Sequence, residues 1–155
     1  MPRNAPTNNN DPAQNGGDDN LSRDERIAQA AMADKRYPAA AFAYVAKAVP
    51  AVAKELCARE KNRSARKHIS GQELTEGLRR LLLRDFGRMA IDVLKSWHIT
   101  RTLDFGEIVY DLVAVNVLSV SPQDSREDFV DVYDFDEAFT KSIIPRGPVK
   151  PLPIL

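Results

Sequence analysis

Apolar residues recur every three or four positions through the middle of this 155-residue chain, and no other feature constrains the fold as strongly. The pattern predicts a long helix over residues 39–58, with apolar positions Phe42, Val45, Val49, Val52 and Leu56. A weaker helix is predicted over residues 21–36, with Ile27, Ala30, Ala31 and Met32 as its apolar side. Pro50 lies inside the long helix and lacks a backbone N–H, so we expect a kink or a break at residues 48–50.

The clearest helix start in the chain is the capping box Ser70-Gly71-Gln72-Glu73. A leucine stripe follows it as far as Phe86, and Gly87 provides the end. Two shorter helices are predicted next. The first has Met89, Ala90, Val93, Leu94 and Trp97 on one side, and the second, capped by Thr102 or Asp104, has Phe105, Ile108, Val109, Leu112 and Val113.

The hydrophobic period changes after Asn116. Residues 118–121 alternate, residues 122–125 are typical of a turn, and residues 129–135 are rich in β-branched and aromatic side chains. These features favour a small β-hairpin, and a loop leading into a short helix at residues 136–141 is the alternative. We therefore predict a mainly α, compact helical domain over residues 21–140. Helices followed by a hairpin have the outline of a winged helix, although an outline does not fix a function.

The two ends differ from this middle. Residues 1–20 consist largely of Asn, Pro, Gly, Asp and Gln and hold too little apolar surface to offset the entropy of ordering, so they are predicted to be a disordered tail. Residues 141–155 form a Pro-rich tail, with four prolines at 145, 148, 151 and 153, and are predicted to be extended. This second tail is either free or a docking peptide, for a partner or for its own domain.

Several spaced motifs carry a resemblance to a known family. They are Tyr37-Pro38, residues 68–74 (HISGQEL), Phe86-Gly87, residues 97–99 (WHI), 102–109 (TLDFGEIV), 124–129 (DSREDF) and 133–135 (YDF). In this order they resemble an uncharacterised family of short bacterial proteins, over roughly residues 37–139. The resemblance implies a bacterial source and a compact domain, and it implies no activity. Pro50 departs from it, because the resemblance implies an unbroken first helix.

The formal net charge is zero, but the charges are segregated. Residues 59–101 hold eleven basic against five acidic side chains, whereas residues 102–140 hold one basic against ten acidic. The two blocks either pair with each other, form solvated faces, or steer association with a partner. In winged-helix proteins that read DNA, the last of the three helices enters the major groove beside the phosphates. Here the corresponding helix and the turn that follows are acidic and would repel phosphate, so sequence-specific binding to a DNA operator is disfavoured. If nucleic acid binds, the candidate surface is the basic segment at residues 59–67, which Arg79 and Arg80 can extend. Its cationic members are Arg59, Lys61, Arg63, Arg66 and Lys67.

Catalytic and metal-binding patterns are weak. Asp104-Phe105-Gly106 matches the magnesium-binding triplet of protein kinases but lacks every other kinase motif, so Gly106 is interpreted as a site of close helix packing. His68 and His98 lie thirty residues apart without a ligand-spaced partner, and we expect His98 to be exposed beside Trp97. The single Cys57 has no adjacent histidine. The aspartates at 124, 128, 131, 134 and 136 do not match a calcium loop.

These observations predict no cofactor and no metal, and no apolar run is long enough to cross a membrane. A single cysteine also excludes an internal disulfide. We therefore expect a cytoplasmic, non-enzymatic binding or adaptor module that contacts a protein partner or itself. Nucleic-acid or ribosome binding through residues 59–67 is the first alternative, and an enzyme of unrecognised type is the second.

Overall fold

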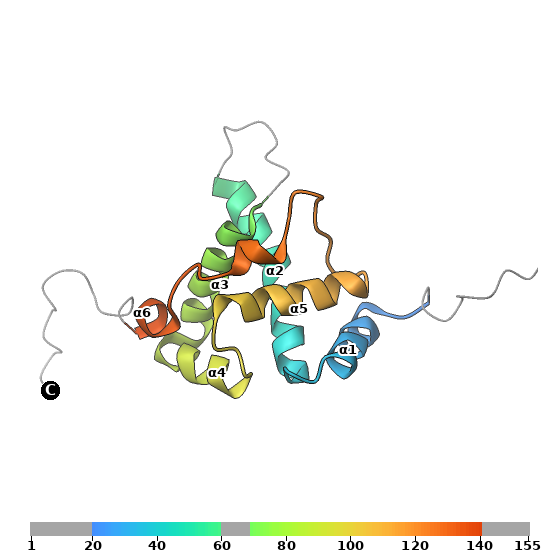
Figure 1. Ribbon diagram of the computed structural model, residues 1–155, viewed down its shortest axis with the longest axis horizontal. Coiled ribbons are helices and arrows are strands. Elements are labelled where there is room, and N and C mark those ends of the chain that lie inside the picture. The colour runs from blue at the N-terminus through green and yellow to red at the C-terminus, as the bar shows by residue number, and fades with distance from the viewer. Residues whose placement is uncertain (1–19, 60–68, 141–155) are drawn as a thin grey trace, which may run out of the picture.

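The computed structural model describes residues 20–59 and 69–140. Both predicted tails therefore lie outside the described residues, apart from Asn20. The described chain forms eight helical elements (Figure 1). They are α1 (Arg23–Ala33), α2 (Ala39–Arg59), α3 (Gly71–Phe86), η1 (Gly87–Met89), α4 (Ala90–Ser96), α5 (Thr102–Ala114), η2 (Arg126–Phe129) and α6 (Phe135–Thr140). The predicted mainly helical class is confirmed.

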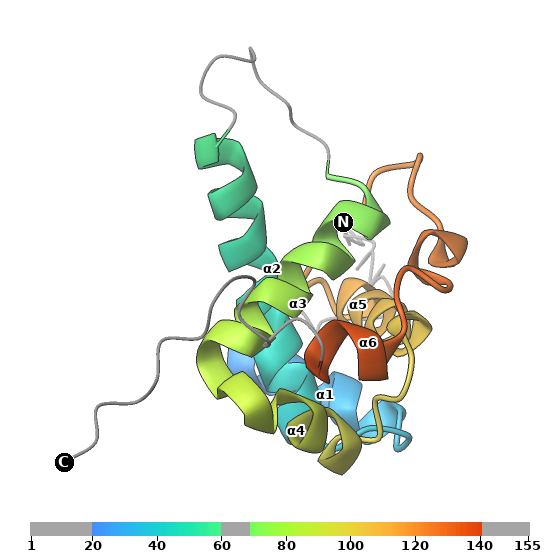
Figure 2. The same cartoon turned by 90° about the vertical axis from the view of Figure 1, so that its left-hand side faces the viewer.

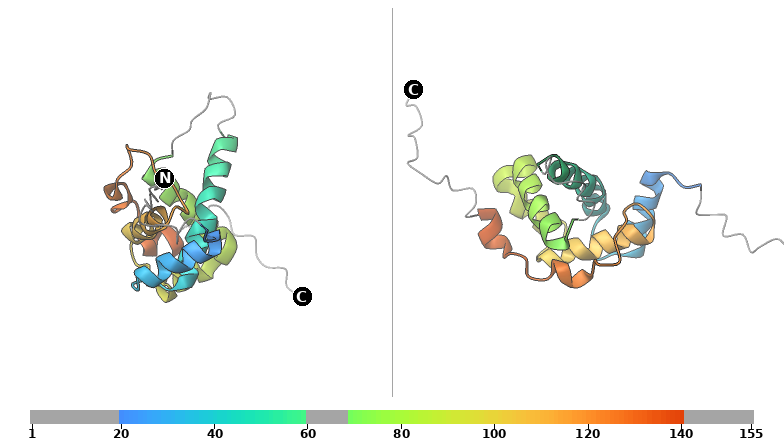
Figure 3. Two further views of the ribbon diagram at one scale, coloured as in Figure 1. Left: turned by 90° about the vertical axis from the view of Figure 1, so that its right-hand side faces the viewer. Right: turned by 90° about the horizontal axis from the view of Figure 1, so that it is seen from above.

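Helix α2 stands at the centre of the fold and contacts α1, α3 and α5. Its predicted apolar positions Phe42, Val45 and Val52 are buried, which confirms the helical period. Helix α5 crosses in front of α2, and η2 lies against both α5 and α3 (Figures 1 and 3). The C-terminal half of α2 and the N-terminal half of α3 diverge from each other above the body of the molecule (Figure 2). This divergence determines where the candidate site lies.

Helix α2 runs through Pro50 from Ala39 to Arg59, so of the predicted kink or break the break does not occur. A proline at this position leaves the carbonyl of Ala46, four residues earlier, without its usual donor. Arg23 supplies the missing hydrogen bond, because its Nη2 donates to that carbonyl at 2.7 Å. The same guanidinium donates through Nη1 to the carbonyl of Val117 at 3.1 Å. One side chain of α1 therefore stabilises the proline turn of α2 and holds the chain that leaves α5.

Within residues 20–59 and 69–140 there is no β-strand, so the predicted hairpin and the winged-helix outline are not supported. The alternative of a loop leading into a short helix is the one observed. Phe129, from the segment predicted as a strand, is buried, and the Thr102 hydroxyl donates to its carbonyl at 2.6 Å. The same hydroxyl accepts from the N–H of Val132 at 3.1 Å. Contacts with α5 thus satisfy backbone groups that a hairpin would have paired.

The predicted helix ends are largely confirmed. Ser70 is the N-cap of α3 and accepts from the N–H of Glu73 at 3.1 Å, and Gly87 ends the helix with a φ of 55°. Asp104 caps α5 from its third position, accepting from the N–H groups of Thr100 and Arg101. Two predicted apolar positions are wrong, because Met32 and Met89 are exposed.

Candidate functional site: an apolar cavity between α2 and α3

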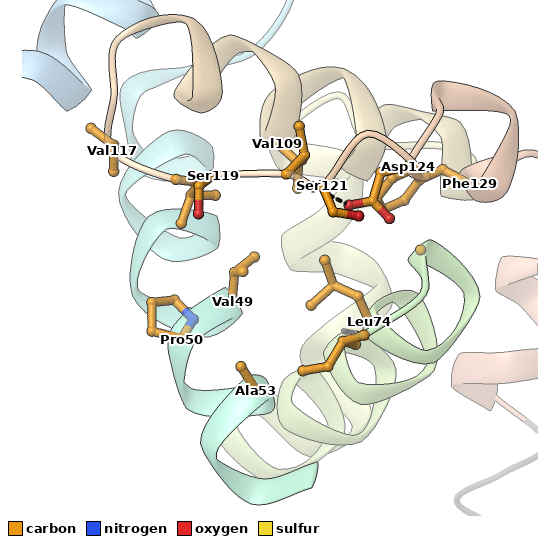
Figure 4. A pocket seen from close by; sticks show the side chains of 14 residues that line it. Val49, Pro50, Ala53, Leu74, Val109, Val117, Ser119, Ser121, Asp124 and Phe129 are labelled. Carbon is orange, nitrogen blue, oxygen red and sulfur yellow. Dashed lines mark hydrogen bonds between the residues drawn. The ribbon is translucent and has the colours of Figure 1, made fainter. Parts of the chain in front are cut away.

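A cavity of about 490 Å³ opens where α2 and α3 diverge (Figure 4). Helix α2 forms one wall, the first turns of α3 form the other, and the chain between α5 and η2 closes one side. This volume is in the range of small-molecule and peptide-side-chain sites. Its lining residues are Val49, Pro50, Ala53, Ile69, Gly71, Leu74, Val109, Val117, Leu118, Ser119, Val120, Ser121, Asp124 and Phe129.

Glycines and small side chains explain why the cavity lies here. A Cβ on Gly77 would overlap Cγ1 of Val52, so the backbone of α3 at Gly77 lies against the Val52 side chain of α2. Helix α2 lines the cavity with Val49, Pro50 and Ala53, and a proline and an alanine are too small to fill the widening gap. The wall on the η2 side is equally tight, because a Cβ on Gly71 would lie 2.7 Å from the Cβ of Asp128.

The polar content of the cavity is small. Its polar side chains are Ser119, Ser121 and Asp124, and the Asp124 carboxylate accepts from the N–H of Ser121 at 2.8 Å. Asp124 is thus the one titratable group among the described lining residues. In the part of the chain that the structure describes, no three His, Cys, Asp or Glu side chains are grouped so as to hold a metal ion. The arrangement favours burial of apolar groups over acid–base chemistry.

The predicted basic site is described only at its first residue. Arg59 is the last residue of α2, its side chain is 55% exposed, and its Nη2 lies 2.8 Å from Oε1 of Glu55. Lys61, Arg63, Arg66 and Lys67 lie outside the described residues. Arg79, a possible extension of the site, is paired with Glu76 at 2.5 Å.

The two charge blocks make little contact with each other where both are described. Arg101 and Asp104, 3.8 Å apart, form the one ion pair between described members of the basic and acidic blocks. The remaining ion pairs between described residues lie within a block, join Arg59 to Glu55 outside the blocks, or involve Arg36, as between Arg36 and Glu107 at 3.2 Å. Internal pairing of the blocks is therefore not the dominant arrangement in the described part of the chain.

Sequence reasoning missed a second polar cluster, which joins the turn after α1 to α5. Arg36 donates to Asp34 at 2.7 Å and to Glu107 at 3.2 Å, and Arg126 of η2 approaches Glu107 at 3.4 Å. Burial and the neighbouring Asp34 carboxyl raise the pKa of Asp111 to about 7, whereas the Arg36 guanidinium holds the pKa of Asp34 well below its usual range. No sequence motif marks this cluster, because its members come together only through packing of the α1–α2 turn on α5.

The other candidate residues have structural roles or are exposed. Asp104 is buried and accepts from the hydroxyl of Tyr37 at 2.6 Å, in addition to its capping bonds. Gly106 confirms the prediction of close packing, since a Cβ there would lie 2.7 Å from Cγ of Phe129. His98 is exposed, as predicted, and has a φ of 61° two residues after the end of α4, and Cys57 is exposed on α2. His68 lies outside the described residues.

The fold and the site together define a helical domain with an apolar cavity that is open between two diverging helices. Comparison of the chain with family models, curated proteins and solved structures finds no match. The resemblance to short bacterial proteins therefore gains no support. Among the described residues, no helix combines the length and the apolar character needed to cross a bilayer.

Proposed function

We propose that this protein is a non-enzymatic binding module that receives an apolar segment of a protein partner in the cavity between α2 and α3. The observation that carries the proposal is the cavity itself, about 490 Å³ in volume and lined by aliphatic and small side chains. Apolar anchors in a preformed groove are a common mode of peptide recognition. The low content of titratable groups makes the enzyme alternative the weaker one.

The position of the cavity also supports binding of a peptide segment. One wall is the C-terminal half of α2, which stands out from the body of the molecule and exposes its far side to solvent (Figure 2). An entering segment would contact Val49 and Ala53 on one side and Leu74 on the other, with Phe129 beside α3 and η2 (Figure 4). Burial of apolar side chains of the partner there would contribute about 25 cal/mol for each Å² removed from water.

The test is capture of partners by the tagged full-length chain, with and without nuclease, using two matched variants. Ala53→Trp fills the cavity, and Ala43→Trp places the same ring on an exposed face of the same helix. We expect a nuclease-resistant partner that is lost with Ala53→Trp and retained with Ala43→Trp. Equal capture by both variants would overturn the proposal.

Nucleic-acid binding through the basic segment at residues 59–67 is the second candidate. Two observations favour it: Arg59 is exposed at the end of α2, and the charge blocks pair little between described residues. Changing Arg63, Arg66 and Lys67 together to Glu should abolish such binding and flatten its salt dependence, by about 0.9 in the log–log slope for each lost phosphate contact on B-form DNA. Mobility shifts of the two proteins on generic duplex and single strands, over a salt series, measure this.

A further inference from the structure

We infer that the Pro-rich C-terminal segment of this chain, residues 141–155, docks in the cavity between α2 and α3 and occupies it until a partner displaces it. The inference rests on the proposed function in treating the cavity as a docking site, and it adds how access to that site is regulated. Three properties of the segment and the cavity support it: apolar complementarity, charge complementarity and reach.

The segment has the side chains that the cavity accommodates. It contains six aliphatic residues, at 143, 144, 149, 152, 154 and 155, and four prolines. An extended, proline-containing strand has little conformational entropy to lose on docking, so its aliphatic side chains bind with a smaller ordering cost than those of a flexible chain. The walls that would receive them are Val49, Ala53, Leu74, Val109 and Phe129.

The charges of the segment are opposite to those beside the cavity. Residues 141–155 contain Lys141, Arg146 and Lys150 and no acidic side chain. Residues 125–131, whose Phe129 lines the cavity and whose Asp128 contacts Gly71, contain three acidic side chains and one basic. That single basic residue, Arg126, is paired with Glu107 of α5. The rim next to η2 therefore attracts a basic segment.

The connection is long enough. Helix α6 ends at Thr140 and contacts α3 and α4, and α3 is itself a wall of the cavity. Helix α3, which is about 24 Å long and about 10–12 Å across with its side chains, sets the scale of the path from α6 to the cavity. Fifteen residues span roughly 50 Å when extended, so the aliphatic residues at 149–155 can reach the cavity without any movement of α6.

The single cysteine permits a direct test with the full-length chain. Cys57 is exposed on α2, one helical turn beyond Ala53, so a paramagnetic label on it reports on chain segments near the cavity. We expect the label to reduce the amide signal intensities of Val149, Lys150, Leu152, Ile154 and Leu155, which are the residues of 149–155 that carry a backbone N–H. A label on Lys35→Cys in a Cys57→Ser background, at the opposite end of α2 (Figure 1), should leave those signals unchanged.

Three variants decide the outcome. Ala53→Trp and the tail variant Leu152→Asp/Ile154→Asp should each restore the tail signals, and Ala43→Trp should not. The tail variant changes none of the described residues, so it keeps the test valid if Ala53→Trp does not fold. Unreduced tail signals in the unmodified protein, or reduction that persists in the tail variant, would overturn the inference.

The remaining outcomes separate this inference from its alternatives. Signal loss that appears only between labelled and isotope-enriched copies in a mixture would mean that a second copy donates the segment, which overturns docking within one chain. Capture of a partner that depends on the cavity, without any tail signal loss, would leave the proposed function and remove only this inference. A docked tail without cavity-dependent capture of a partner would leave this inference and overturn the proposed function.

Discussion

At the scale of single residues, Pro50 and Arg23 show how a side chain from one helix can replace a backbone donor in another. Proline in a helix interior costs about 3 kcal/mol or more, in part because the carbonyl four residues earlier loses its donor. In α2 that carbonyl belongs to Ala46, and Arg23 donates to it at 2.7 Å. The proline is thus accommodated by a residue twenty-seven positions earlier in the sequence.

A double-mutant cycle tests this compensation. Arg23→Ala should destabilise the protein by about 1–3 kcal/mol, because two carbonyls lose a charged donor. In a Pro50→Ala background the same change should cost about 1 kcal/mol less, since the substituted residue again has a backbone N–H that can donate to the Ala46 carbonyl. Denaturant unfolding of the four proteins measures the coupling. Strictly additive free energies would show that Arg23 acts on Val117 alone.

The pKa of Asp111 is raised and the pKa of Asp34 is lowered, so the two carboxyl groups should contribute to the pH dependence of stability with opposite signs. The pKa of Asp111 is raised to about 7, by burial first, so the folded state holds an extra proton between pH about 4 and 7. Asp111 therefore lowers stability as the pH rises through this window, and Asp111→Asn should remove the loss. After allowance for partial exposure we expect a gain of roughly 1–2 kcal/mol at pH 7.5.

Asp34→Asn is the matched control. Arg36 lowers the pKa of Asp34, so ionised Asp34 stabilises the fold above its unfolded pKa and this contribution is lost as the pH falls. Its replacement should therefore reduce stability at neutral pH, opposite to Asp111→Asn. Denaturant unfolding of the unmodified protein and both variants, at pH values from about 4.5 to 7.5, measures the two effects. Equal slopes for Asp111→Asn and the unmodified protein would contradict the assignment.

At the scale of elements, the contact between α2 and α3 depends on Gly77. Alanine has the higher helix propensity by about 1 kcal/mol, so an exposed helical glycine would be improved by it. Here the added methyl would overlap Val52, which is itself buried. We expect Gly77→Ala to destabilise the fold by about 1–3 kcal/mol through overpacking, and we expect Val52→Ala to relieve much of that cost when the two are combined.

Thermal unfolding of the two single variants and the double variant measures the relief. A second readout is the cavity, because forcing α3 away from α2 at Gly77 should change how the two helices diverge beside Ala53 and Leu74. Stabilisation by Gly77→Ala would mean that α2 and α3 are farther apart than the structure has them.

Helices were predictable from the sequence where their signals are local. The start of α3 at the Ser70 cap and its end at Gly87 follow from cap chemistry within a few residues. The period of Phe42, Val45 and Val52 likewise placed α2. The predicted hairpin failed because the fate of Phe129 depends on distant residues: Gly106 leaves space for its ring, and Thr102 binds its carbonyl. No local pattern contains those contacts.

At the scale of the whole molecule, the candidate site was less predictable than the fold. The cavity results from the angle at which two helices separate, and its small wall residue Ala53 reads in sequence as an ordinary helical position. Close approach at Gly77 was a readable signal, since a glycine inside a leucine-rich helix often marks tight packing. The basic segment was easier to find because its charges lie close together in the sequence and can be counted there. The cavity forms only when the helices pack, so the sequence does not display it.

The charge segregation of the whole molecule predicts how its stability responds to salt. Between described residues the basic and acidic blocks share one ion pair, and like charges are concentrated within each block along the sequence. Salt screens repulsion within such clusters, with a Debye length of about 30 Å at 0.01 M and about 10 Å at 0.1 M. The melting temperature should therefore rise modestly between these concentrations of NaCl. If the blocks were paired throughout the molecule, salt would lower the melting temperature instead.

A variant with fewer acidic charges separates screening from general salt effects. Glu127→Gln and Asp131→Asn remove two exposed charges from the segment around η2, and asparagine tolerates the φ of 47° at position 131. This pair should raise the melting temperature at low salt and reduce the response to NaCl, because less repulsion is left to screen. Melting curves of both proteins over the same salt series measure the difference. An unchanged response would mean that the acidic block does not destabilise the fold.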